Sequence, residues 1–311
     1  MLSIEAVVFP TDRTAHAERA FAHAVRFARD CDAALHVLNV DVGQDPTGAP
    51  VLSEPSDLDA FSARLHSAAA ESVGVRVVHA TMPARSVQRG ILDYAEQANA
   101  DLVVLATHGR EGLEHALIGS VAEGVVRRAH CPVVTVRPAP TAAPTAPRSV
   151  LVPIDFSAHS RTALAYAREV ARPVGAALHL LHVHEVLPRY GLVDVPPEPP
   201  PMSGEMQESL HAALRAVAAE VLGPETPPTT HVASGLGNAA VGVLDEAERL
   251  SVDLIVQASH GRTGPRRFFA GSVAERVVQL APCPVLTVKA FGKSLLPGAG
   301  ARGRSSHERT A

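Results

Sequence analysis

A long internal repeat constrains the fold of this chain more than any other feature of its sequence. The segment from Asp101 to Val136 aligns without a gap with the segment from Asp253 to Val288, 152 residues further along. The starts of the two copies match as well, since VVFPTDRT and LVPIDFS share an apolar run that ends beside an aspartate. The repeat indicates two copies of one folding unit, and 311 residues suffice for two domains of about 150 residues each.

The repeat also sets the predicted domain boundaries. Copy one is expected to span residues 1–138 and copy two residues 148–290, with a Pro/Ala/Thr linker at 139–147 that should not pack. Copy two carries nine extra residues between the matched blocks, and we place them in the proline-rich stretch 187–206. Residues 291–311 are predicted to be a disordered tail.

Each copy alternates apolar runs with helical patterns. Near-continuous apolar runs are typical of a parallel sheet that is covered on both faces, and apolar residues at helical spacing lie between them. In copy one the predicted strands are Ala6–Phe9, Leu35–Val40, Val75–Val78, Leu102–Ala106 and Val133–Val136. The order predicts an α/β fold of two tandem doubly wound domains, each a five-stranded parallel sheet with helices on both faces.

A glycine turn after the fourth strand of each copy carries the predicted chemistry. The turn reads ATHG in copy one and ASHG in copy two, and nine residues then lead to a Gly-Ser pair that opens a helix. A glycine lets the backbone approach an anion, and the first N–H groups of a helix can donate to one. The serine hydroxyls and the arginine after the turn add donors and positive charge. The pattern therefore predicts a cradle for a polyphosphate, built twice.

This pattern resembles the signature of the universal stress protein family, Gly-x-x-Gly, nine residues and Gly-Ser/Thr, with GSVAE and CPV following. The resemblance covers nearly residues 1–290 and implies a tandem member of the ATP-binding type, with the adenine nucleotide alpha hydrolase-like fold. It implies ATP, with or without Mg²⁺, as the cofactor. One departure is that the first glycine of the signature is alanine in both copies, Ala106 and Ala258.

The resemblance assigns roles residue by residue. An aspartate after the first strand would lie near adenine and ribose, a valine at the end of the second strand would contact adenine, and the glycines and serine would hold ribose and phosphates. The full set of predicted nucleotide-binding residues is Pro10, Asp12, Val40, Ala106, His108, Gly109, Arg110, Gly119, Ser120 and Val121 in copy one, and Pro153, Asp155, Val183, Ala258, His260, Gly261, Arg262, Gly271, Ser272 and Val273 in copy two.

The two predicted sites differ in charge. The nine-residue loop of copy one contains one arginine and two glutamates, a formal charge of −1, whereas the loop of copy two contains three arginines, a charge of +3. A triphosphate should therefore prefer copy two. Asp12 and Asp155 could instead have a purely structural role, in which each only caps the first helix of its copy.

Three functions remain open on this basis. The first is an ATP-binding stress-response or signalling module. The second is a slow ATPase: no Walker lysine is present and no catalytic residue is assigned, although Asp12 and Asp155 could help to hold a metal ion. The third is a nucleotide-free scaffold, which Ala106 and Ala258 favour mildly.

Other apparent motifs carry little weight. Gly235–Ala240 resembles a dinucleotide fingerprint and Gly292–Ser294 the end of a P-loop, but the partner residues that each motif needs are missing. The histidines of the strand His179–His184 are not repeated in copy one, so no metal site is predicted. The three cysteines are far apart and are interpreted as reduced, buried thiols.

Composition excludes further partners. A net charge of −4 and 19% charged residues give no general attraction to nucleic acid or to an anionic membrane. No apolar run reaches the ~18 residues of a membrane span, no signal peptide is expected, and a cytoplasmic location is predicted. The resemblance implies an intramolecular pseudo-dimer through Pro132–Val136 and Pro284–Val288, and a further association of two such chains into a homodimer is left open.

Overall fold

The computed structural model describes residues 2–12, 15–43, 74–107, 119–137, 146–186, 202–223, 227–236, 238–260, 272–289 and 291–297. Copy one contains β1 (Ala6–Pro10), α1 (Ala15–Asp30), β2 (Ala34–Asp41), β3 (Val77–Pro83), α3 (Val87–Gln97), β4 (Leu102–Ala106), α4 (Ser120–Arg128) and β5 (Val133–Val136). Copy two contains β6 (Ser149–Pro153), α5 (Ala158–Ala171), the 3-10 turn η2 (Arg172–Val174), β7 (Ala177–Val186), α6 (Gly204–Leu222), β8 (Thr229–Leu236), α7 (Ala239–Arg249), β9 (Leu254–Ala258), α8 (Ser272–Leu280) and β10 (Val285–Val288).

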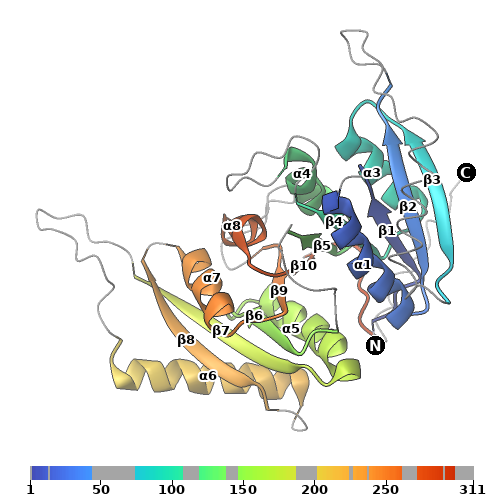
Figure 1. The fold of residues 1–311 in the computed structure, drawn as a ribbon. Coiled ribbons are helices and arrows are strands. Elements are labelled where there is room, and N and C mark those ends of the chain that lie inside the picture. The colour runs from blue at the N-terminus through green and yellow to red at the C-terminus, as the bar shows by residue number, and fades with distance from the viewer. Residues whose placement is uncertain are drawn as a thin grey trace, which may run out of the picture.

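All ten strands belong to one continuous sheet, in the order β3-β2-β1-β4-β5-β10-β9-β6-β7-β8 (Figure 1). Within each copy every neighbouring pair of strands is parallel. The copies meet where β5 and β10 pair in antiparallel fashion, with Val134 opposite Leu286. This order confirms the doubly wound α/β fold of each copy.

The two faces of the sheet are covered by different helices. One buried cluster contains apolar residues of α1, α5 and α6, and the other contains those of α3, α4, α7 and α8. Alternate residues of a strand face opposite sides, so Val7 and Phe9 pack into the first cluster and Val8 into the second. Burial on both faces explains why these strands read as continuous apolar runs.

The third strand of copy one differs from its prediction. The sequence indicated Val75–Val78, whereas β3 spans Val77–Pro83. As the outermost strand, β3 is partly exposed, and its exposed and half-buried residues alternate from His79 onward. The apolar run ends at the exposed His79, whereas the pairing of β3 with β2 continues to Pro83, so the predicted strand lies too early in the sequence.

Contacts other than strand pairing join the two copies at the seam. The buried ammonium group of Lys289 donates a hydrogen bond to the carbonyl of Val126 near the end of α4. Burial lowers the pKa of Lys289 to about 8, and the nearby Cys131 acts in the opposite direction. Arg127 of α4 lies 4.0 Å from Glu275 of α8. The seam is therefore a packed interface with buried polar contacts.

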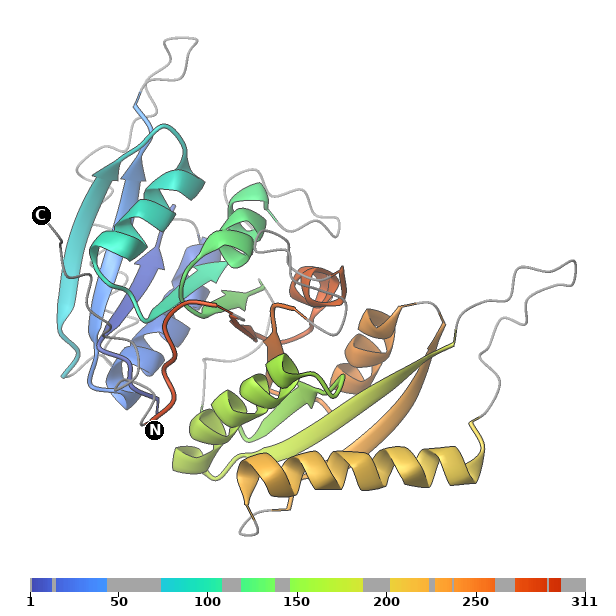
Figure 2. The ribbon, with the colours of Figure 1, turned by 180° about the vertical axis from the view of Figure 1, so that it is seen from behind.

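Residues 291–297 correct the prediction of a disordered tail from residue 291. Leu295 is only 1% exposed, its carbonyl accepts from the amide of Ser3 at 2.9 Å, and its amide donates to the Tyr166 hydroxyl at 2.7 Å. Figure 2 shows this red segment running from β10 toward the N-terminus of copy one. The burial of Leu295 and the ion pair of Lys293 with Asp101 hold this segment in place, although its composition resembles that of a linker. Residues 298–311 lie outside the described residues.

A repeated aspartate ties the fourth strand of each copy to the first. Asp101 Oδ2 accepts from the amides of Glu5 at 2.7 Å and Ala6 at 3.0 Å, and Asp253 Oδ2 accepts from the corresponding amides that precede and begin β6 at 2.9 and 3.0 Å. In copy one the carboxylate also meets Lys293 Nζ at 2.5 Å. Asp101 is thus both a brace within copy one and an anchor for the C-terminal segment.

Among the described residues, we find no helix that combines the length and the apolar character needed to cross a membrane.

Candidate functional site

The carboxyl ends of the inner strands open to the surface at the positions that the sequence analysis selected. β1 and β4 are buried up to their last residues, Pro10 and Ala106, which are partly exposed. β6 and β9 end in the same way at Pro153 and Ala258. In an open parallel sheet, ligands bind beyond these ends. Among the described residues, Pro10, Asp12 and Ala106 of copy one and Pro153, Asp155 and Ala258 of copy two therefore lie at or just beyond the carboxyl ends of these strands.

The start of α4 lies directly beside this edge. The amide of Gly119 donates to the carbonyl of Thr107 at 2.8 Å, which holds the first turn of the helix against the end of β4. A Cβ on Gly119 would lie 3.2 Å from that same carbonyl oxygen, so the approach is close. Ser120, the first helical residue, is exposed.

The N-terminus of α4 differs from the others for which the structure describes a cap. The helices α3, α5, α6 and α7 are each capped by a side chain that accepts a backbone amide, from Ser86, Ser157, Ser203 and Asn238 respectively. α4 begins at Gly119 without a side-chain cap. The first amides of a helix point outward along its axis and carry partial positive charge. This helix start can therefore donate to an anion.

The aspartate after the first strand is partly buried in both copies, as Asp12 and Asp155. Asp155 Oδ1 accepts from the amide of Ser157 at 3.0 Å. The cap of α5 is Ser157, whose hydroxyl accepts from the amide of Ser160 at 3.2 Å. Asp155 thus braces the turn that precedes the helix, and the helix cap itself is a different residue.

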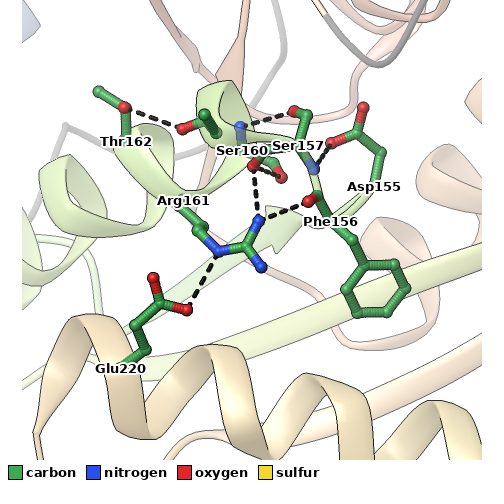
Figure 3. A network of polar contacts seen from close by, with 8 residues as sticks. Asp155, Phe156, Ser157, Ser160, Arg161, Thr162 and Glu220 are labelled. Atoms are coloured by element: carbon green, nitrogen blue, oxygen red, sulfur yellow. Dashed lines mark hydrogen bonds and ion pairs between the residues drawn. The ribbon is translucent and has the colours of Figure 1, made fainter.

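The turn after β6 has an unusual backbone. Phe156 has a φ of 66°, a left-handed conformation that bulky residues rarely adopt. Its ring lies against His182, with ring centroids 4.7 Å apart, and His182 Nδ1 is 2.7 Å from the carbonyl oxygen of Ile154. Figure 3 shows Asp155, Phe156 and Ser157 beside the guanidinium group of Arg161. The turn that presents Asp155 is therefore held by the contact of the Phe156 ring with His182 and by polar contacts of the neighbouring backbone.

Comparison with known proteins connects this geometry to a family. The profile of the universal stress protein family matches residues 3–137 and again residues 147–289. The chain belongs to the universal stress protein family.

Individual members support this assignment over parts of the chain. A universal stress protein of Methanocaldococcus jannaschii is 36% identical over 42% of this chain and 81% of its own length. One from Mycolicibacterium smegmatis is 33% identical over 66% of each chain, just under two thirds. The crystal structure of a universal stress protein from Archaeoglobus fulgidus superposes with a TM-score of 0.58 at 22% identity, covering 91% of this chain and 98% of that one. The fold is the adenine nucleotide alpha hydrolase-like fold of the family.

Several predicted site residues of this universal stress protein cannot be placed. His108, Gly109, Arg110, Gly261, Arg262 and Gly271 lie outside the described residues, as do the other charged residues of the two nine-residue loops. His260 is described: its Nδ1 is 3.0 Å from the hydroxyl of Ser259, and its ring centroid is 6.4 Å from that of His159 and 6.3 Å from that of Phe291. Ser272, Val121 and Val273 are exposed or partly exposed at the helix starts.

Two glycines that the sequence analysis did not select support the valines of the site. Val40 and Val183 are partly exposed near the ends of β2 and β7. A Cβ on Gly90 of α3 would lie 2.5 Å from Val40 Cγ1, and one on Gly242 of α7 would lie 2.8 Å from Val183 Cγ1. The two glycines are 152 residues apart, the same offset as the signature, and that repetition could have revealed them.

Gly242→Ala should displace Val183, because real side chains do not tolerate a carbon contact of 2.8 Å. We expect a loss of about 1–3 kcal/mol of folding stability from overpacking. Under the nucleotide binding proposed below, ATP affinity at copy two should fall roughly tenfold, about 1.4 kcal/mol. Urea unfolding measures the change in stability, and calorimetric titration measures the change in affinity. Gly204→Ala in α6 is the control, since a Cβ there meets nothing within 4 Å. Unchanged affinity in Gly242→Ala would show that Val183 does not shape the site.

The remaining candidates of the sequence analysis have structural roles. His179 Nδ1 is 3.1 Å from His231 Nε2, whereas His182 lies on the opposite face of β7, and the described residues include no group of three or more metal-ligating side chains. Burial raises the pKa of Cys131 and of Cys283 to about 12, which disfavours the thiolate form.

The two rejected nucleotide motifs also have other contacts. The start of α7 is already bonded by Asn238 and by Glu185, whose carboxylate accepts from the amide of Ala239 at 3.0 Å. Lys293 pairs with Asp101. The described residues of both motifs are therefore engaged in contacts other than those of a phosphate loop.

Proposed function

We propose that this universal stress protein binds an adenine nucleotide, foremost ATP, at each copy and acts as a nucleotide-dependent stress-response or signalling module. The observation that carries the proposal is the start of α4, where amides without a side-chain cap lie beside the half-exposed ends of β1 and β4. The residues present fit a nucleotide: amide and hydroxyl donors suit phosphates, and an apolar valine near the end of the second strand suits a base.

The proposed role of each residue in the site follows from the chemistry of its side chain. Ser120 or Ser272 would donate to phosphate at the helix start. Val40 or Val183 would cover one face of the base, and Asp12 or Asp155 would accept hydrogen bonds from the ribose hydroxyls. A bound nucleotide supplies a negatively charged polyphosphate, which would accept hydrogen bonds from the amides at the helix start. This contact would favour one conformation of the signature loop that precedes the helix.

Copy two is proposed as the tighter site. Its signature loop carries a formal charge of +3, against −1 for the loop of copy one, and attraction of a triphosphate grows with local positive charge. The antiparallel pairing of β5 and β10 supports the further proposal that the two copies act as an intramolecular pseudo-dimer.

The test uses the purified full-length chain. Denaturation should release an adenine nucleotide that mass spectrometry identifies, and calorimetric titration of the stripped chain with ATP should give two binding events of unequal affinity. Absence of both would leave a nucleotide-free scaffold, the reading that Ala106 and Ala258 favour. Steady-state phosphate release well above that of a Ser120→Asp, Ser272→Asp chain would instead indicate an ATPase.

A further inference from the structure

The turn between β6 and α5 is held by contacts from outside the turn itself. The left-handed φ of Phe156 is unfavourable for a bulky residue and persists where neighbouring groups impose it. Asp155 precedes Phe156 in the chain and Ser157 follows it, and the Asp155 carboxylate accepts a hydrogen bond from the Ser157 amide. The direction of the Asp155 carboxylate therefore depends on the backbone of Phe156.

Arg161, one turn into α5, contacts this backbone. Its Nη1 donates to the carbonyl oxygens of both Phe156 and Ser157, the latter at 3.2 Å. Its Nε donates to Glu220 of α6 at 3.2 Å, so the guanidinium group is fixed from the other side. Figure 3 shows the group bridging the turn and the carboxylate of α6.

We infer that Arg161 is a positioning residue of the copy-two site: by binding the two carbonyls of the turn, it holds Asp155 in the orientation that receives the nucleoside. This inference rests on the proposed nucleotide binding and adds a residue that does not touch the ligand. A charge-assisted hydrogen bond to a carbonyl is stronger than a neutral one, and a pre-ordered turn loses less freedom when a ligand binds.

The sequence of copy one differs at the position of Arg161. The matched starts of the copies place Glu18 at the position of Arg161, 143 residues earlier. A carboxylate accepts hydrogen bonds and cannot donate them to carbonyl oxygens. The arginine that contacts the turn in copy two therefore has no basic counterpart at the matched position of copy one, and this difference is separate from the charge difference between the signature loops.

Two measurements on Arg161→Gln test the inference. Without nucleotide, the Ser157 amide should exchange its hydrogen at least about tenfold faster than in the parent chain, because the turn is released. In an Asp12→Ala background that weakens copy one, ATP affinity at copy two should fall about tenfold. Arg168→Gln is the matched control: Arg168 also links α5 to α6, through the carbonyl of Val221 at 2.8 Å, and its other contact is with Glu169, away from the turn.

A double-substitution cycle separates positioning from general destabilisation. Asparagine tolerates a left-handed conformation, so in a Phe156→Asn background Arg161→Gln should cost less than about twofold in affinity. Equal exchange of the Ser157 amide in the Arg161→Gln and parent chains would overturn the inference whatever the ligand. Faster exchange in a chain that binds no nucleotide would refute the proposed function and leave the brace of the turn standing.

Discussion

A chain carrying both Ser120→Asp and Ser272→Asp is expected to lose adenine nucleotides from both copies, with Kd raised at least about 100-fold. Both serines are exposed first residues of their helices. Each aspartate places a carboxylate where the phosphate of the nucleotide would accept hydrogen bonds from the helix start. The two negative charges repel each other, which costs several kcal/mol. A loss of about 2.7 kcal/mol already corresponds to a 100-fold rise in Kd.

The same double variant should fold at least as well as the parent chain. A carboxylate in the first turn of a helix interacts favourably with the helix dipole, by about 0.3–1 kcal/mol per site. Urea unfolding should therefore show an unchanged or slightly raised midpoint while calorimetry shows no ATP binding. The control is the pair Ser120→Ala and Ser272→Ala, which removes a donor without adding charge and should weaken binding only about tenfold. Retained affinity in the aspartate variant would place the ligand elsewhere.

Asp101→Ala is expected to have the largest effect on stability, a loss of about 3 kcal/mol or more. The carboxylate is 1% exposed and accepts two backbone amides, and each buried amide left without a partner costs about 1–3 kcal/mol. Removal of Asp101 also frees Lys293 and so loosens the C-terminal segment. The free energy of unfolding in urea measures the loss.

Asp253→Ala provides a built-in comparison for this prediction. Asp253 accepts two corresponding amides in copy two, but among the described residues no lysine pairs with it. The loss in Asp253→Ala should therefore be smaller by at least about 1 kcal/mol, the usual range for a partly exposed ion pair, and Asp253 is also the less buried of the two carboxylates. Lys293→Ala should account for the ion-pair part of that difference in the parent chain and cost nothing further in an Asp101→Ala background. Equal losses at Asp101 and Asp253 would show that the pairing of Lys293 contributes no stability.

The sequence predicted those parts of the fold that leave a periodic or repeated pattern. The inner strands are buried on both faces, so β1, β4 and β5 were placed within a residue of their bounds. The signature recurs at a fixed offset, and the structure brings its described residues to one edge of each sheet. Val40 and Val183 are predicted as base contacts only through the family resemblance, since nothing within their apolar runs distinguishes them, and β2 and β7 continue beyond them to Asp41 and Val186.

Other features could not be predicted because they depend on contacts between segments far apart in the chain. The packing of Leu295 requires Ser3 and Tyr166, and neither is near it in sequence. The left-handed backbone of Phe156 has no local sequence signal, since glycine or asparagine is the usual residue there. The edge strand β3 was shifted because its partly exposed residues break the apolar run that marked the other strands.

The antiparallel seam between β5 and β10 has a consequence for how the molecule can diversify. Because both seam strands come from one polypeptide, each meets its counterpart at an effective concentration on the order of millimolar, and dilution does not separate them. An assembly of two identical chains would place every substitution in both halves at once. In the proposed pseudo-dimer each half faces an unlike half, so an arginine can be introduced in one half while a glutamate is kept at the matched position of the other half.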